Sequence, residues 1–298
     1  MGVLAAGLVF TGGAMAAQTE GPAVDRETRI ASGDRVMDAA FAERAKNLNL
    51  KSASVLVVHQ DDGRALYAKN TGTVVPIASI TKLMTAIVTL DAKPALDEHV
   101  RISEADIDDI KGTRSRLKVG SELTRGDLLR LALMASENRA AAALGRAYPG
   151  GTAAFVSAMN QKAIELGMWR TRFVDSTGLS SDNVSTAQDL VKMVNAAYRY
   201  PLVREYTTDT DRTVRLANGR TLRYRNSNGL VKNPSWHIGL SKTGYISEAG
   251  RCLVMQAEIA STSVVIVLLD SWGKLSRMGD ANRIKKWIES HSARQPAG

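Results

Sequence analysis

Apolar and polar residues follow two different periods along this chain, and the change of period divides it into three regions. Near both ends lie short apolar runs rich in β-branched residues, which predict strands. Between them, apolar residues recur every three or four positions, which predicts helices. This order favours an α+β fold: an antiparallel sheet built from both chain ends with flanking helices, and an inserted helical subdomain from about residue 91 to 230.

The strands are predicted at both ends of the chain. Near the start, residues 53–59 and 65–68 flank the turn Asp61-Asp62-Gly63, a pattern typical of a hairpin. An amphipathic helix over residues 35–48 precedes them. After Trp236, strands are expected at 238–241, 252–260 and 263–269, followed by a closing helix at 282–290.

A strongly apolar helix follows the first hairpin. From Ser79 the sequence SITKLMTAIVTLDA carries apolar residues at helical spacing, so we expect a buried helix that begins at Ser79. Further helices are predicted at 123–134, 138–146, 152–166 and 187–199. A cleft is expected where this helical part meets the sheet.

The first charged side chain of the chain is Glu20. An apolar run over residues 3–10, followed by Ala14-Met15-Ala16, predicts a signal peptide at 1–16, because the run is too short to cross a bilayer. Residues 17–34 are expected to form a flexible leader before a catalytic domain at 35–298. The protein is therefore expected to be exported, with no transmembrane anchor in the mature chain.

The formal charge of +9 indicates either a polyanionic partner or a solvated basic surface. Nucleic acid is not expected, because an exported protein rarely meets DNA. An anionic cell-wall polymer suits an exported protein better. The single cysteine, Cys252, excludes an intrachain disulfide and a Cys-rich metal site, and neither a metal nor another cofactor is expected.

Ser79 and Lys82 are the first candidates for chemistry. They are three residues apart at a helix start, so their side chains are neighbours. A buried lysine loses its proton more readily and can then activate a serine hydroxyl. The spacing alone is weak evidence, because it recurs in two other pairs: Ser115 with Lys118, and Ser271 with Lys274.

Two further polar segments strengthen this hypothesis. Ser136-Glu137-Asn138 interrupts an apolar helical pattern, where polar residues favour a loop facing a cleft. Lys242-Thr243-Gly244 follows the apolar segment 238–240 of a predicted strand, and Gly244 allows close approach of the backbone.

At this point the sequence resembles the low-molecular-mass penicillin-binding proteins of the serine DD-peptidase/β-lactamase superfamily, which share the motifs S-x-x-K, S-x-N and K-T-G. The resemblance spans roughly residues 50–292. It rests on four segments: PIASITKLMTA (76–86), LMASENRAAA (133–142), FVDSTGLSSDNVSTAQDL (173–190) and HIGLSKTGY (237–245).

The resemblance implies a role for each matching residue. Ser79 would be the acylated nucleophile, Lys82 its base, and Ser136 a proton relay. The substrate-binding residues would be Asn138, Lys242, Thr243, Gly244 and Tyr245, with the amides of Ser79 and Tyr245 as the oxyanion hole. The family acts on the peptide stems of peptidoglycan in the periplasm, and β-lactams inhibit it covalently.

Within the family, the flanking sequences resemble the D-alanyl-D-alanine endopeptidases most, and no extra C-terminal domain follows the closing helix. A D-alanyl-D-alanine carboxypeptidase and a non-catalytic penicillin-binding sensor remain alternatives. A β-lactamase is less favoured, because Glu165 lacks the expected loop context.

One ambiguity concerns the second motif. Ser181-Asp182-Asn183 matches S-D-N to the letter, but Ser136 lies between two helices as the family requires, so Ser136 is preferred. Histidine-based catalysis is not expected, because the four histidines accompany no G-x-S-x-G motif, and His237 is interpreted as a cleft-wall or packing residue.

Overall fold

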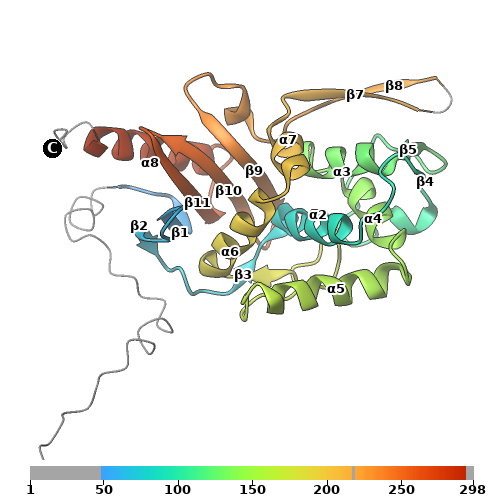
Figure 1. The fold of residues 1–298 in the computed structure, drawn as a ribbon, viewed down its shortest axis with the longest axis horizontal. Helices are drawn as coiled ribbons and strands as arrows, with labels where there is room; N and C mark the ends of the chain where they lie inside the picture. The colour runs from blue at the N-terminus through green and yellow to red at the C-terminus, as the bar shows by residue number, and fades with distance from the viewer. Residues whose placement is uncertain (1–47, 217–218, 293–298) are drawn as a thin grey trace, which may run out of the picture. The chain divides into compact units, whose positions relative to one another are not determined.

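The structure, a computed structural model, describes residues 48–216 and 219–292. Its largest element is a five-stranded antiparallel sheet in which the first two strands of the chain lie beside the last three, in the order β2-β1-β11-β10-β9 (Figure 1). The predicted α+β fold with a sheet from both chain ends is confirmed. The strands are β1 Ser52–His59, β2 Ala65–Lys69, β9 His237–Ile246, β10 Gly250–Ile259 and β11 Thr262–Ser271. The predicted signal peptide, leader and helix at 35–48 lie outside the described residues.

Helices cover both faces of this sheet, because side chains alternate between the faces along each strand. Val57 of β1 belongs to the apolar cluster that includes α8 (Ser276–Ser292). Its neighbours Leu56 and Val58 belong to the other cluster, which includes α6 (Ala187–Tyr198). The predicted closing helix contributes three large apolar residues to this α8 cluster: Ile284, Trp287 and Ile288.

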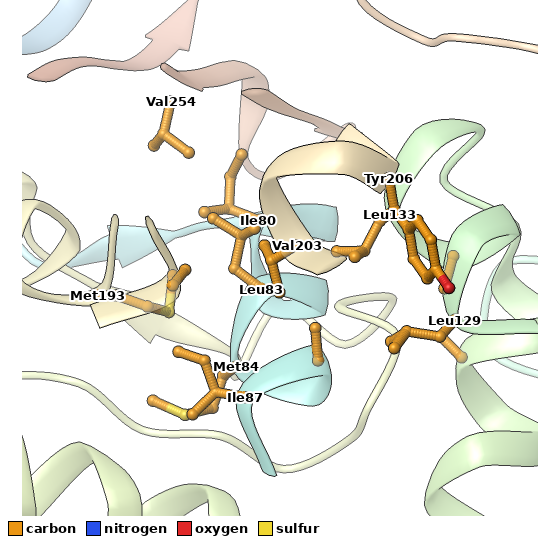
Figure 2. Packing of buried hydrophobic residues seen from close by; sticks show 14 of the residues in the cluster. Ile80, Leu83, Met84, Ile87, Leu129, Leu133, Met193, Val203, Tyr206 and Val254 are labelled. Atoms are coloured by element: carbon orange, nitrogen blue, oxygen red, sulfur yellow. The ribbon is translucent and has the colours of Figure 1, made fainter. Parts of the chain in front are cut away.

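Helix α2 (Lys82–Asp91) lies at the centre of the larger apolar cluster, and its residues 82–89 are all buried. Figure 2 shows four apolar residues of α2 and of the turn before it among side chains from α6, from β10 and from two more helices. The helices of this part are α3 Arg125–Met134, α4 Asn138–Arg146, α5 Gly151–Glu165 and α7 Pro201–Thr208. Packing on several sides fixes the start of α2 in place.

The helix predicted to begin at Ser79 opens with a tighter turn than expected. Ala78–Thr81 forms a 3-10 helix, η1, and α2 starts only at Lys82. The non-glycine residue Ala78 has a φ of +47° immediately before the serine, a conformation that costs energy outside glycine. Because side chains three residues apart eclipse one another in a 3-10 turn, this winding brings Lys82 towards Ser79.

The region from about residue 91 to 230 is less helical than predicted. It contributes three two-stranded ribbons, one of them shared with the segment before α2, and two further 3-10 turns. The ribbons are β3 Val75–Pro76 with β6 Val184–Ser185, β4 His99–Arg101 with β5 Glu122–Thr124, and β7 Asp211–Arg215 with β8 Thr221–Arg225; the turns are η2 Glu104–Asp106 and η3 Gly229–Lys232. Strands of two or three residues are too short to show an alternating pattern in the sequence.

Candidate active site

The side chain of Lys82 is completely buried at the start of α2, beside the hydroxyl of Ser79. Its Nζ donates to three oxygens: Ser79 Oγ at 2.8 Å, Asn138 Oδ1 at 2.7 Å and the Thr177 carbonyl at 2.6 Å. Two of these are carbonyl oxygens, which can only accept. When Lys82 is neutral, its two hydrogens therefore go to the carbonyls and its lone pair faces the hydroxyl of Ser79.

Burial lowers the pKa of Lys82 to about 7, because a charged ammonium loses its hydration there. The carboxylates of Asp175, Glu137 and Asp108 act in the opposite direction and favour the charged form. The balance leaves a substantial neutral fraction at neutral pH. A lysine in this state can accept a proton from Ser79.

Ser136 and Lys242 form a second pair of the same chemistry. Ser136 lies between α3 and α4 with a φ of +60°, and Lys242 Nζ donates to its Oγ at 2.8 Å and to the Thr243 carbonyl at 2.8 Å. Burial lowers the pKa of Lys242 well below its usual value, and the positive charges of Lys82 and Arg277 add to this effect. Each of the two lysines therefore donates to its own serine, Lys82 to Ser79 and Lys242 to Ser136.

The two other residues of the second motif, Glu137 and Asn138, have separate roles. Glu137 is the N-cap of α4, where its carboxylate accepts from the Arg139 amide at 3.3 Å. Asn138 Nδ2 donates to Thr113 Oγ1 at 2.9 Å, and the Thr113 hydroxyl donates to Asp108 Oδ2 at 2.6 Å. Since a carboxylate only accepts, this chain fixes the orientation of the Asn138 amide, with its oxygen towards Lys82.

Strand β9 forms one edge of the sheet and carries the third motif. A Cβ at Gly244 would lie 2.9 Å from the Ile77 carbonyl and 3.1 Å from the Ser79 amide nitrogen, so only glycine lets β9 pass this close to the nucleophile turn. Thr243 Oγ1 is 2.7 Å from Ser227 Oγ. Tyr245 is 56% exposed, with the Arg251 guanidinium over its ring.

The competing Ser181-Asp182-Asn183 sequence has a structural task. Asn183 is completely buried, accepts from the Val174 amide at 3.0 Å and donates to Asp175 Oδ2 at 2.6 Å. Asp175 also accepts from the Thr177 and Gly178 amides at 2.6 Å each. This network holds the Thr177 carbonyl against Lys82, whereas Ser136 is the serine that contacts Lys242.

The two other serines with a lysine three residues later make different contacts. Ser115 Oγ accepts from the Leu117 amide at 3.0 Å, and Ser271 Oγ is 2.6 Å from Ser52 Oγ. His237 is exposed at the start of β9, which excludes packing, one of its two expected roles.

Four residues of the site were missed in the sequence: Thr113, Thr177, Ser227 and Arg277. Thr177 lies in a segment that carried the family resemblance, which is the only signal that could have found it. Arg277, from α8, donates to the carbonyls of Gly244 at 2.7 Å and Cys252 at 3.2 Å, and burial lowers its pKa to about 10.

Within residues 48–216 and 219–292, no cluster of three His, Cys, Asp or Glu residues could hold a metal ion.

Comparison with known families agrees with this geometry. The profile of the peptidase S11 family, described as D-alanyl-D-alanine carboxypeptidase, matches residues 40–272, most of the chain. The chain belongs to this family. The resemblance to the penicillin-binding DD-peptidases that the motifs indicated is confirmed.

The relatives of this S11 peptidase include enzymes named D-alanyl-D-alanine endopeptidase. The one from Pseudomonas aeruginosa is 50% identical over 242 residues, which cover 81% of this chain and 78% of the relative. The one from Escherichia coli is 44% identical over 256 residues, covering 86% and 83%.

Solved structures also share the fold of the S11 peptidase. The Streptomyces K15 DD-transpeptidase superimposes with a TM-score of 0.75 at 28% identity, covering 80% of this chain and 97% of that one. Penicillin-binding protein D2 of Listeria monocytogenes, solved with bound cefotaxime, gives a TM-score of 0.71 at 30% identity, covering 81% and 98%.

Proposed function

We propose that this protein is a serine DD-endopeptidase that hydrolyses D-alanyl-linked peptide cross-links of peptidoglycan through an acyl-enzyme on Ser79. The observation that carries the proposal is the buried Lys82, whose pKa is lowered to about 7 and whose amine lies 2.8 Å from the hydroxyl of Ser79. The names of the two endopeptidase relatives support the substrate class.

Acylation begins when Ser79 Oγ attacks the carbonyl carbon of the D-alanyl peptide bond and its proton passes to Lys82 Nζ. The negative charge that develops on the substrate oxygen is stabilised by the backbone amides of Ser79 and Tyr245. The close approach of β9 at Gly244 supports this assignment, because it brings the strand against the Ser79 amide.

The leaving amine needs a proton when the C–N bond breaks. Ser136 Oγ gives this proton and takes one from Lys242, to which it is hydrogen-bonded. Lys242 and Thr243 hold the free carboxylate of the departing D-residue, and this anion favours the charged form of Lys242. Asn138 keeps one amide hydrogen for a substrate carbonyl. Water then attacks the acyl carbonyl; its proton restores the charge of Lys242 through Ser136, and Lys82 returns its proton to Ser79 Oγ as the ester bond breaks.

The partners and the compartment follow from the same proposal. Peptidoglycan stems are the substrate, and β-lactams acylate Ser79 by the same attack on a carbonyl, as the cefotaxime complex of the Listeria relative supports. The predicted signal peptide and the wall substrate support a periplasmic location. No helix in the described part of the chain is long and apolar enough to cross a membrane.

The test is to incubate the protein with fluorescent penicillin and, separately, with cross-linked muropeptide dimers and with pentapeptide stems. Covalent labelling and conversion of dimers to monomers are expected. Release of D-alanine from pentapeptides without cleavage of dimers would make it a carboxypeptidase. Labelling without cleavage of either substrate would indicate a penicillin-binding sensor.

Thr113 provides a test of how the site is ordered. Thr113→Val removes the hydroxyl that orients the Asn138 amide while keeping the side-chain shape, so acylation by fluorescent penicillin is expected to slow about tenfold, the effect of one hydrogen bond. Thr113→Ser restores the hydroxyl and is expected to restore the rate. Equal rates for the valine and serine variants would show that the amide needs no such support.

A further inference from the structure

Two short segments beside the active site carry positive charge without any acidic residue. Residues 114–118 read RSRLK, and residues 220–225 read RTLRYR. Together they contribute six cations. We call this set the basic surface: Arg114, Arg116, Lys118, Arg220, Arg223 and Arg225.

The two segments lie side by side and hold each other in place. The Arg116 guanidinium lies 3.7 Å from the centre of the Tyr224 ring and donates to the Arg223 carbonyl. Arg220 donates in turn to the Arg116 carbonyl at 3.5 Å. These contacts hold the two segments together, so their six cations lie in one part of the molecule.

The ribbon of β7 and β8 presents one face to the solvent. Val214 and Tyr224 are buried on its inner face, so Arg223 and Arg225 point outwards. The one acidic residue of the ribbon, Asp211, pairs with Arg223 at 3.2 Å. Among the described residues, Arg225 has no ion-pair partner.

A hollow of about 400 Å³ lies between the ribbon and the β4–β5 part of the molecule. Its lining includes Lys118 and Arg220 of the basic surface, together with Arg101 and one acid, Glu122. Because three positive side chains and one carboxylate line it, the hollow has a net positive charge and attracts anions.

Both segments lead directly into the active site. Thr113, which precedes Arg114, bonds to Asn138. Ser227, two residues after Arg225, bonds to Thr243. When the bond to be cut lies at Ser79, the part of the polymer that extends beyond the active site therefore lies beside this surface.

We propose that the basic surface binds carboxylate groups on the peptide stems that neighbour the bond cut at Ser79. This inference rests on the proposed function, because that function supplies the polymer. The proposed reaction requires stems with a free carboxylate, and arginine binds carboxylates with two parallel hydrogen bonds. A single exposed ion pair contributes little binding energy, so one stem binds weakly. A polymer with many carboxylates forms several pairs at once and therefore binds more tightly than a single stem.

The experiment compares two triple variants that each lose three exposed cations. Arg114→Ala/Arg223→Ala/Arg225→Ala removes half of the basic surface but keeps Arg116 and Arg220, which hold the segments together. Lys51→Ala/Lys274→Ala/Lys286→Ala is the control, with its changes before β1, before α8 and on α8, outside both segments of the basic surface. Binding to purified sacculi freed of phosphate polymers is measured in a Ser79→Ala background, which prevents cleavage.

The basic-surface variant is expected to bind sacculi about tenfold more weakly than the control at low salt, with the difference lost near 0.5 M salt. In proteins with Ser79 intact, both variants should label with fluorescent penicillin at the wild-type rate, which shows that they are folded and that the proposed function stands. Equal binding of sacculi by both variants would overturn the inference. So would a loss of binding confined to a phosphate polymer such as DNA.

Discussion

Ser79→Ala is expected to abolish covalent labelling by fluorescent penicillin and to reduce cleavage of cross-linked dimers to background. The alanine side chain has no oxygen to attack a carbonyl, so no acyl-enzyme can form. The fold should be unaffected, because the hydroxyl of Ser79 does not cap η1 or α2. Labelling is measured on denaturing gels, and intact-mass spectrometry gives the stoichiometry of the adduct.

The chain offers a matched control in Ser115→Ala. Ser115 has a lysine at the same spacing as Ser79, but it lies in a loop where its hydroxyl bonds to the Leu117 amide. This variant should label fully. If Ser79→Ala still carried a stoichiometric penicillin adduct, the nucleophile would have to be another residue, and the proposed mechanism would fail.

The pairing of Ser79 with Lys82 could be predicted because it is local. Three residues of helical chain bring the two side chains together whatever the rest of the fold does. The apolar residues of α2 also indicated burial, and burial is the cause of the lowered pKa of Lys82. What the spacing could not distinguish was this pair from the two others, because that difference lies in the contacts of Ser115 and Ser271.

The contacts between distant segments could not be predicted from residue patterns. The Thr177 carbonyl reaches Lys82 from a segment 95 residues away, and Arg277 reaches β9 from α8. Which lysine serves which serine is also decided by such contacts, since Lys242 bonds to a residue 106 positions earlier. The resemblance to a family identified Ser136 and Lys242, but not that they form a pair.

The fold, like the site, has features that the sequence predicted and features that it did not. Most long apolar strands and helices were predicted within three residues, and the sheet from both chain ends follows from their order. Strand β9 extends five residues beyond the predicted 238–241, and α8 begins six residues before the predicted 282–290. The ribbon of β7 and β8 was missed, although Val214, Leu222 and Tyr224 alternate with charged or polar residues and Asn218-Gly219 is a strong turn signal. The ribbon was missed because the Ala- and Leu-rich helices that precede it led to a helical prediction for the whole region.

The rate of acylation by penicillin should rise with pH through about 7 and level off above pH 8. Lys82 accepts the proton of Ser79 only when it is neutral, and its pKa is lowered to about 7 by burial. Below this value the neutral fraction falls tenfold per pH unit, so the rate at pH 5 should be about 100-fold below the plateau. Stopped-flow labelling between pH 5 and 9 gives the profile.

Lys82→Ala tests whether that profile belongs to this lysine. Loss of the general base should slow acylation by about 10² to 10⁴-fold and remove the rise at pH 7. A small primary amine, which can occupy the space left by the side chain, should restore part of the rate, whereas a quaternary ammonium ion of similar size should not, because it has charge but no lone pair. Rescue by both cations would show that Lys82 acts through its charge. A rise at pH 7 that persists in Lys82→Ala would instead assign the titration to Lys242 acting as the base through Ser136, which contradicts the proposed roles of the two lysines.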